Sequence, residues 1–202
     1  MDNFEFARDK QIVFFDLDDV LFPEKDYLLQ VYYLFAQFIE YSEQLNAQQL
    51  LEFMHKTYAE EGTDLLFDKT ANRFSIPEKY KENFDRLHQN ARLPLKLLLF
   101  QNMLSFLQEL IVNRKKIVLV IDGDPETQLN KIKQTEWNGL EKYLTVFFTY
   151  ELNLPKSDVF KNVLSESDLT VNDALLVGAK KNDEEISKLI KLPYIESLKI
   201  YN

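Results

Sequence analysis

The sequence predicts an α/β protein, with a parallel sheet covered by helices and an all-helical segment inserted after the first strand. A continuous apolar run, residues 12–15, is typical of a strand buried on both faces. Residues 23–95 carry helical periodicity and no strand pattern. From about residue 96, apolar strand runs alternate with helical stretches, which predicts a parallel sheet with helices on both faces.

The inserted segment starts after Pro23 with a long amphipathic helix. Its apolar residues recur three and four positions apart: Leu28, Val31, Tyr32, Phe35, Phe38 and Ile39. A second helix ends at Gly62, and a third covers residues 78–89. We therefore expect a helical cap at 23–95 and an α/β core made of residues 1–22 and 96–202.

The rest of the core is expected to alternate helix and strand. Helices are predicted at 97–110, 126–134, 158–164 and 183–190, and strands at 117–121, 146–148, 174–177 and 195–200.

Composition and charge exclude several classes of function. The chain has 202 residues, 33 acidic against 24 basic, so its net charge is −9 and nucleic acid is not an expected partner. It has no cysteine, which excludes disulfides, thiolate metal sites and cysteine nucleophiles. With only His55 and His88, a three-histidine zinc site is excluded as well.

No targeting or membrane segment is evident. The first ten residues alternate charged and aromatic side chains, unlike a signal peptide. The apolar runs are far shorter than the ~20 residues of a membrane helix. We therefore expect a cytoplasmic protein that does not contact membranes.

Three aspartates directly follow the first strand: Asp16, Asp18 and Asp19. A polar turn that starts a helix would account for them in structural terms. However, Asp16 and Asp18 are two positions apart and point the same way on an extended turn. Like charges held together need a cation or a shared proton. Ligands of open parallel sheets bind at the carboxyl ends of the strands, where Gly123 and Gly178 also fall.

The segment Val13-Phe14-Phe15-Asp16-Leu17-Asp18-Asp19-Val20-Leu21 resembles the first motif, hhhDxDx(T/V)L, of the haloacid dehalogenase superfamily. The segment after it resembles the branch of phosphatases with a helical cap. Asp122-Gly123-Asp124-Pro125, followed by Gln128 and Lys131, is similar to the second-motif region, and residues 147–152 to the approach to the third-motif lysine.

The resemblance implies the superfamily's α/β core and mechanism. Asp16 would attack phosphorus and form an aspartyl-phosphate. Asp18 would protonate the leaving alcohol and later activate water. Mg²⁺ would be held by Asp16, Asp18 and acids of the fourth motif, and a lysine would offset charge on the transferring group.

The second motif departs from the family pattern. Ile121 stands where Thr or Ser would bond the phosphate, so only the backbone N–H groups of Asp122 and Gly123 could bind it there.

The third and fourth motifs leave alternatives open. The third-motif lysine is either Lys156, after a loop deletion, or is replaced by Leu154; we favour Lys156, although a solvated loop lysine is the structural alternative. In the fourth motif Ala179 replaces the first acid, and either Asp183 or Glu184 stands for the second.

These motifs favour two functions. The first is a Mg²⁺-dependent phosphatase of a small phosphorylated metabolite, acting through Asp16. The second is a catalytically weak or inactive member that binds a ligand or partner, which Ile121 and Ala179 favour. A dehalogenase is a minor third, because that branch typically lacks the second aspartate. Substrate and oligomeric state are not predicted.

Overall fold

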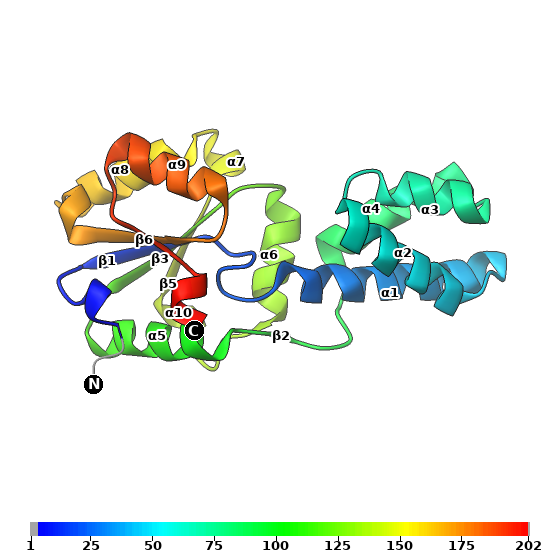
Figure 1. Cartoon of the computed structure of the whole chain (residues 1–202), viewed down its shortest axis with the longest axis horizontal. Coiled ribbons are helices and arrows are strands. Elements are labelled where there is room, and N and C mark those ends of the chain that lie inside the picture. Colours follow the sequence, from blue (N-terminus) through cyan, green and yellow to red (C-terminus); the bar gives the residue numbers. More distant parts are fainter. Residues whose placement is uncertain (1–3, 202) are drawn as a thin grey trace.

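A parallel sheet with helices on both faces, and a group of helices to one side of it, make up the computed structural model, which describes residues 4–201 (Figure 1). The predicted α/β fold is confirmed. Residues 1–3 and 202 of the predicted core lie outside the described residues.

The sheet has five strands in the order β5-β3-β1-β6-β7, and each neighbouring pair is parallel. The strands are β1 (Ile12–Phe15), β3 (Lys116–Ile121), β5 (Leu144–Phe148), β6 (Ala174–Gly178) and β7 (Tyr194–Glu196). β1 lies in the centre. The acidic turn that follows it is therefore at the middle of the sheet's carboxyl edge.

Strand β1 is buried on both faces because its side chains enter two separate hydrophobic clusters. Val13 and Phe15 pack in the larger cluster, and Ile12 and Phe14 pack in the smaller one. Phe14 contacts Phe160 of α8 (Lys156–Glu166), with the ring centroids 4.8 Å apart. α8 and α9 (Lys181–Ile190) cover that face, and α5 (Gln101–Val112) covers the other.

Helices are the only regular secondary structure of the inserted segment, residues 23–95, all of which are described. It contains α1 (Glu24–Glu43), α2 (Ala47–Glu61), α3 (Leu66–Phe74), the short η2 (Glu78–Tyr80) and α4 (Lys81–Asn90). The apolar stripe of α1 packs against aromatic residues of α3 and α4, for example Phe35 against Phe67 and Phe84. Its boundaries as a domain stay a prediction.

Helix α6 (Pro125–Gln134) joins the two parts, since it belongs to the core and packs against α4. Asn130 donates to the carbonyl of Ala91 at 3.0 Å and to the Tyr27 hydroxyl at 3.3 Å. A short ladder of β2 (Leu97–Leu98) and β4 (Thr135–Glu136) lies beside it. Side chains at the carboxyl edge of the sheet are thus held close to the helical segment.

Some predicted elements were wrong in position or type. Residues 97–98 form a strand rather than the start of α5. The strand predicted at 195–200 ends at Glu196, and Leu198–Tyr201 form the helix α10. Elements without a prediction are the strand β4, the helices α3 and α7 (Thr149–Leu152), and the short helices η1 (Glu5–Ala7), η3 (Glu141–Tyr143) and η4 (Val171–Asp173). These are short or weakly periodic, so tertiary contacts decide them.

Among the residues that the structure describes, no helix combines the length and the apolar character needed to cross a membrane.

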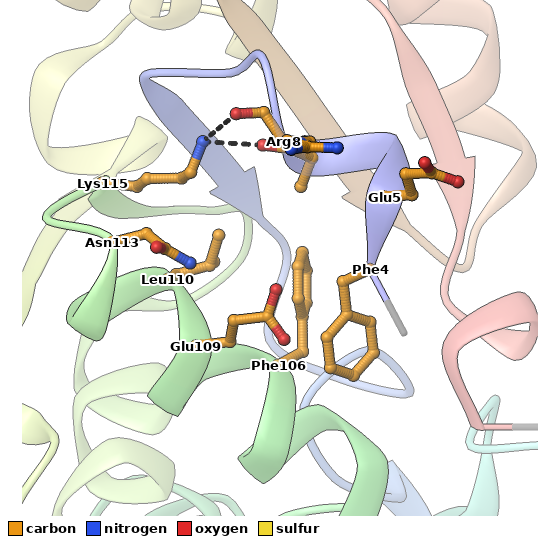
Figure 2. A pocket seen from close by; sticks show the side chains of 9 residues that line it. Phe4, Glu5, Arg8, Phe106, Glu109, Leu110, Asn113 and Lys115 are labelled. Carbon is orange, nitrogen blue, oxygen red and sulfur yellow. Dashed lines mark hydrogen bonds between the residues drawn. The ribbon is translucent and has the colours of Figure 1, made fainter. Parts of the chain in front are cut away.

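A hollow of about 380 Å³ lies between η1 and α5, near the start of β1 (Figure 2). The ammonium of Lys115 donates to the carbonyls of Ala7 and Arg8, at 2.8 and 2.7 Å. Lys115 therefore fastens the N-terminal segment to the core. The hollow is at the amino end of the strands, opposite the edge where such sheets bind ligands.

Protonation of His88 is expected to weaken the fold in mild acid. Its ring packs 4.8 Å from that of Phe84, and burial, aided by nearby Lys131, lowers its pKa to about 4. The unfolded chain has the ordinary value of about 6.5 and binds the proton first. The contribution of neutral His88 to the free energy of unfolding is therefore fully present above pH ~6.5 and is lost as the pH falls toward 4.

Between pH 7.5 and 5 we expect a loss on the order of 2 kcal/mol in the free energy of unfolding. Urea denaturation at both pH values measures it, and His88→Gln should remove most of the difference. The same loss in the variant would show that other groups cause the acid sensitivity.

Candidate active site

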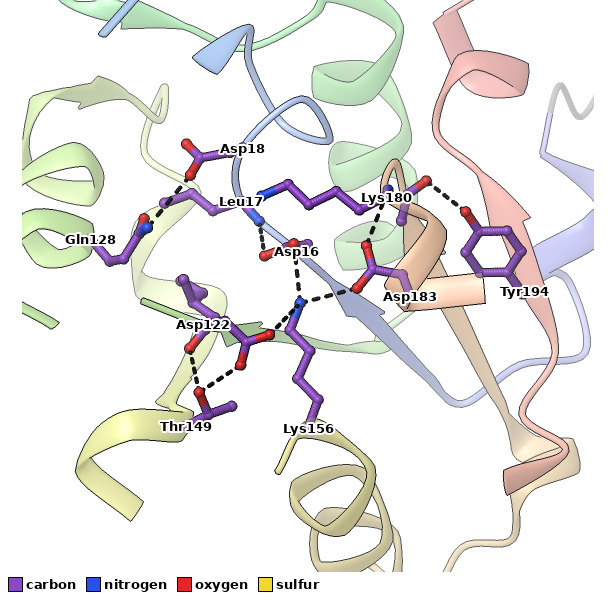
Figure 3. A network of polar contacts seen from close by, with 12 residues as sticks. Asp16, Leu17, Asp18, Asp122, Gln128, Thr149, Lys156, Lys180, Asp183 and Tyr194 are labelled. Carbon is purple, nitrogen blue, oxygen red and sulfur yellow. Dashed lines mark hydrogen bonds and ion pairs between the residues drawn. The ribbon is translucent and has the colours of Figure 1, made fainter. Parts of the chain in front are cut away.

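Polar side chains from separate parts of the chain meet at the carboxyl edge of the sheet (Figure 3). They follow β1, β3, β5 and β6, or begin the helices after them. Their meeting follows from the parallel sheet, because the carboxyl ends of all its strands share one edge.

Lys156 is the central cation of this edge. Its ammonium lies 3.0 Å from Asp16 Oδ2, 3.1 Å from Asp183 Oδ1 and 3.6 Å from Asp122 Oδ2. Its side chain is only 3% exposed. Burial by itself lowers the pKa of Lys156, but the three carboxylates outweigh burial and raise the pKa above its ordinary value. The charged group beside Asp16 is therefore the buried ammonium of Lys156. Leu154, the alternative residue at the third-motif position, has no charge.

Asp16 is held in one orientation from two sides. Its Oδ1 accepts a hydrogen bond from the backbone N–H of Leu17 at 2.9 Å, while its Oδ2 faces Lys156. The residue is 5% exposed. These contacts fix a carboxylate at the end of the central strand, as a nucleophile requires.

Asp18 lies on the side of the turn that faces the helical segment. Its Oδ2 lies 2.6 Å from the ammonium of Lys131, and Gln128 donates to the same oxygen at 3.5 Å. Lys131 also approaches Glu24 at 3.6 Å and lies over the ring of Tyr27. The other oxygen, Asp18 Oδ1, is buried without a hydrogen-bond partner among the described residues. That oxygen is therefore not engaged by another described residue of the protein.

The end of β3 places the two predicted substrate-binding residues beside a hollow. An open space of about 640 Å³ is bordered by Asp122, Gly123 and Thr149. The Thr149 hydroxyl donates to Asp122 Oδ1 at 2.6 Å. Gly123 has φ +103°, a conformation that glycine adopts without strain. Ile121 is 1% exposed and packs in the larger core cluster.

Helix α9 brings Asp183 to the site and leaves Glu184 outside it. Asp183 is buried against Gly178, where an added Cβ would lie 2.6 Å from the Asp183 Cβ. Glu184 instead pairs with Lys188 at 2.6 Å, and half of its side chain is exposed. Ala179 packs against the larger core cluster.

The predicted Mg²⁺ ligands do not form a metal site in this structure. The described residues contain no group of three or more His, Cys, Asp or Glu side chains that could hold a metal ion. Asp16 and Asp183 share Lys156, Asp18 turns to Lys131, and Glu184 lies on the solvent side. The donor set therefore does not fit Mg²⁺.

The sequence motifs gave no chemical role to Glu24 and Thr149, and Lys131 entered only through the similarity to the second-motif region. Gln128 and Lys131 are three apart on α6 and so share a face, and Thr149 directly follows β5, which are signals that the sequence does contain. Asp124 has a structural role, because its carboxylate accepts from the Thr127 N–H at 3.0 Å and caps α6.

Comparisons with known proteins identify the family of this chain. The family model of haloacid dehalogenase-like hydrolases matches residues 13–196. The chain belongs to this family. No curated protein matches it.

Several solved structures of haloacid dehalogenase-like proteins share the fold. The putative HAD-hydrolase YfnB of Bacillus subtilis, bound to magnesium, is 13% identical; the alignment covers 92% of this chain and 87% of that one, with a TM-score of 0.57. A HAD phosphatase from Thermococcus onnurineus is 18% identical over 91% and 84%, with a TM-score of 0.55. The L-2-haloacid dehalogenase PA0810 is 13% identical over 96% and 87%, at 0.55. At these identities the similarity establishes the fold alone.

Proposed function

We propose that this haloacid dehalogenase-like hydrolase cleaves phosphate monoesters through a phosphoryl-enzyme on Asp16. The observation that carries the proposal is the buried Asp16 carboxylate at the end of the central strand, held by the Leu17 N–H and Lys156, with Asp18 two residues away. The HAD phosphatase of T. onnurineus, of the same fold, supports this class of reaction.

In the first step, an Asp16 oxygen attacks phosphorus as the bond from phosphorus to the alcohol oxygen breaks. The leaving oxygen takes a proton from Asp18, which is why the unpartnered Asp18 Oδ1 matters. The products are an alcohol and an aspartyl-phosphate on Asp16.

In the second step, Asp18, now a carboxylate, takes a proton from water, and the water oxygen attacks phosphorus. The Asp16–phosphorus bond breaks, which releases inorganic phosphate and restores both carboxyl groups. Lys131, 2.6 Å from Asp18, stabilises the carboxylate that each turnover produces.

Positive charge must balance the negative charge that builds on the transferring group. Members of this family generally use Mg²⁺ for this task. Here the donor set does not fit that ion, so the protein's own cations are assigned the role. Lys156 is the first of them, because its buried ammonium contacts Asp16 directly.

The substrate class is a small phosphorylated metabolite, such as a sugar phosphate or a nucleotide. The helical cap, residues 23–95, selects it. Glu24, at the start of α1, lies 3.6 Å from the Lys131 ammonium that pairs with Asp18, so the cap's first turn lies beside the reacting groups. A substrate therefore contacts both parts of the chain.

A second candidate is a protein that binds a ligand without efficient turnover. Two observations favour it: Ile121 offers no hydroxyl at the end of β3, and Ala179 offers no carboxylate after β6. Hydrolysis of a generic aryl phosphate separates the two candidates, since only the first releases the aryl alcohol in proportion to active enzyme.

Asp18→Asn is expected to slow hydrolysis by roughly 10²–10⁴-fold, the usual effect of losing a general acid/base. The amide keeps the shape of the side chain but cannot exchange the proton. Steady-state release of the aryl alcohol measures the effect. Asp158→Asn is the control, since Asp158 is exposed and pairs with Lys161 outside the site. Equal rates in both variants would remove Asp18 from the reaction.

A further inference from the structure

Lys180 directly follows Ala179, the position at which the first acid of the fourth motif is missing. It precedes the first residue of α9. Its backbone N–H donates to Asp183 Oδ2 at 3.4 Å, and its side chain extends toward the turn that contains Asp16 and Asp18 (Figure 3). A flexible side chain with a positive end thus reaches from β6 across the carboxyl edge.

The electrostatic surroundings agree with that direction. Partial desolvation of the Lys180 ammonium by itself lowers its pKa, but the charges of Asp16, Asp18 and Glu24 outweigh that effect and raise it, while the residue stays exposed to solvent. The group therefore carries its charge at neutral pH and faces the two aspartates assigned to the reaction.

Lys180 differs from the other two lysines of the site because no carboxylate of the described residues lies within ion-pair distance of its ammonium. Lys131 and Lys156 each lie within 3.1 Å of a carboxylate. Within the described residues, Lys180 forms no salt bridge of 4.0 Å or less, although it faces three acids. An ammonium has three donors, so Lys180 can bind oxygens of a ligand that enters between it and Asp16.

The missing metal site and the added ammonium are complementary changes. Ala179 removes a carboxylate that would attract a divalent cation, and Lys180 adds a positive charge that would repel one. A lysine ammonium is a common ligand for phosphate oxygens.

We propose that the Lys180 ammonium takes the place of a divalent cation and binds the phosphoryl oxygens beside Asp16, so that the site recognises phosphate without a metal. The inference rests on the proposed function for the identity of its ligand. It makes Lys180 a substrate-binding residue of this chain.

Titration of Mg²⁺ into the metal-free protein by calorimetry tests the first part without any turnover. We expect no saturable Mg²⁺ binding in the wild type. The double variant Ala179→Asp/Lys180→Ser, which restores the acid and removes the ammonium, should bind Mg²⁺ saturably, at least about tenfold more tightly than the weakest binding that the same titration detects. Saturable Mg²⁺ binding to the wild type, unchanged in Lys180→Met, would overturn the inference.

Binding of inorganic phosphate in the presence of EDTA tests the second part. Lys180→Met should weaken phosphate binding by about 10–100-fold, the effect of one hydrogen bond to a charged group. Lys181→Met is the matched control, because Lys181 is 88% exposed, pairs with Glu185 and should not alter binding. Equal affinities of the two variants would overturn the inference.

Different results would contradict the phosphatase proposal and the proposal that Lys180 binds phosphate without a metal. Metal-free phosphate binding that depends on Lys180, with no hydrolysis of aryl phosphate, would support the inference and contradict the phosphatase. Hydrolysis that requires Mg²⁺ and persists in Lys180→Met would support the phosphatase and overturn the inference.

Discussion

Replacing Asp16 by asparagine is expected to abolish hydrolysis of an aryl phosphate while the fold survives. The amide is almost the same size as the carboxylate, but it cannot attack phosphorus. Loss of a nucleophile removes the covalent route, so we expect a fall of roughly 10⁴-fold or more. Lys156 keeps Asp183 and Asp122 as partners, so it remains compensated in the variant.

Release of the aryl alcohol under saturating substrate measures the effect, and circular dichroism checks the fold. Asp124→Asn is the control at the same edge of the sheet, because asparagine also caps a helix well and should keep α6 intact. Hydrolysis by Asp16→Asn at the wild-type rate would show that Asp16 is not the nucleophile.

Lys156→Met is expected to destabilise the protein by about 3–5 kcal/mol, the usual result of removing one partner from a buried ionic cluster. The methionine fills the same space but leaves Asp16 and Asp183 buried without their cation. Both residues are at most 5% exposed, so water does not replace the lost partner. The midpoint and slope of urea denaturation measure the change in the free energy of unfolding.

Lys161→Met on the same helix is the matched control. Lys161 is exposed and pairs with Asp158 at 3.1 Å, an exposed contact of about 1 kcal/mol or less. A loss below about 1 kcal/mol in Lys156→Met would show that the cluster around Lys156 is solvated and does not hold Asp16 in place.

The sheet could be predicted from the sequence because its strands are buried on both faces. Residues 12–15 and 117–121 are short continuous apolar runs, rich in β-branched and aromatic side chains, which is typical of strands buried on both faces. Asp16 and Asp18 follow the first of these runs directly, so their place at the carboxyl edge followed from the strand. Helix α10 could not be predicted, because Leu198–Tyr201 is too short to show a period.

The partners within the site depend on distances that the sequence does not contain. Lys131 pairs with Asp18, from which it is 113 positions away in the sequence, and Lys156 pairs with Asp183, 27 positions away. The sequence does not show which face of α9 points to the site. In the structure, Asp183 points inward to Lys156 and Glu184 points outward to Lys188. Ala179 and Lys180 are adjacent in the sequence. The direction of the Lys180 side chain, toward the turn of Asp16 and Asp18, is known only from the structure.

The proposed reaction requires a phosphoryl group that is bound covalently to Asp16 during turnover. Rapid acid quenching of the wild type during turnover of an aryl phosphate, followed by mass spectrometry of the peptide that contains Asp16, detects this group directly. We predict a phosphoryl adduct on Asp16 in the wild type and none in Asp16→Asn. Release of inorganic phosphate by the wild type without any adduct on Asp16, when quenched before one turnover is complete, would contradict the account.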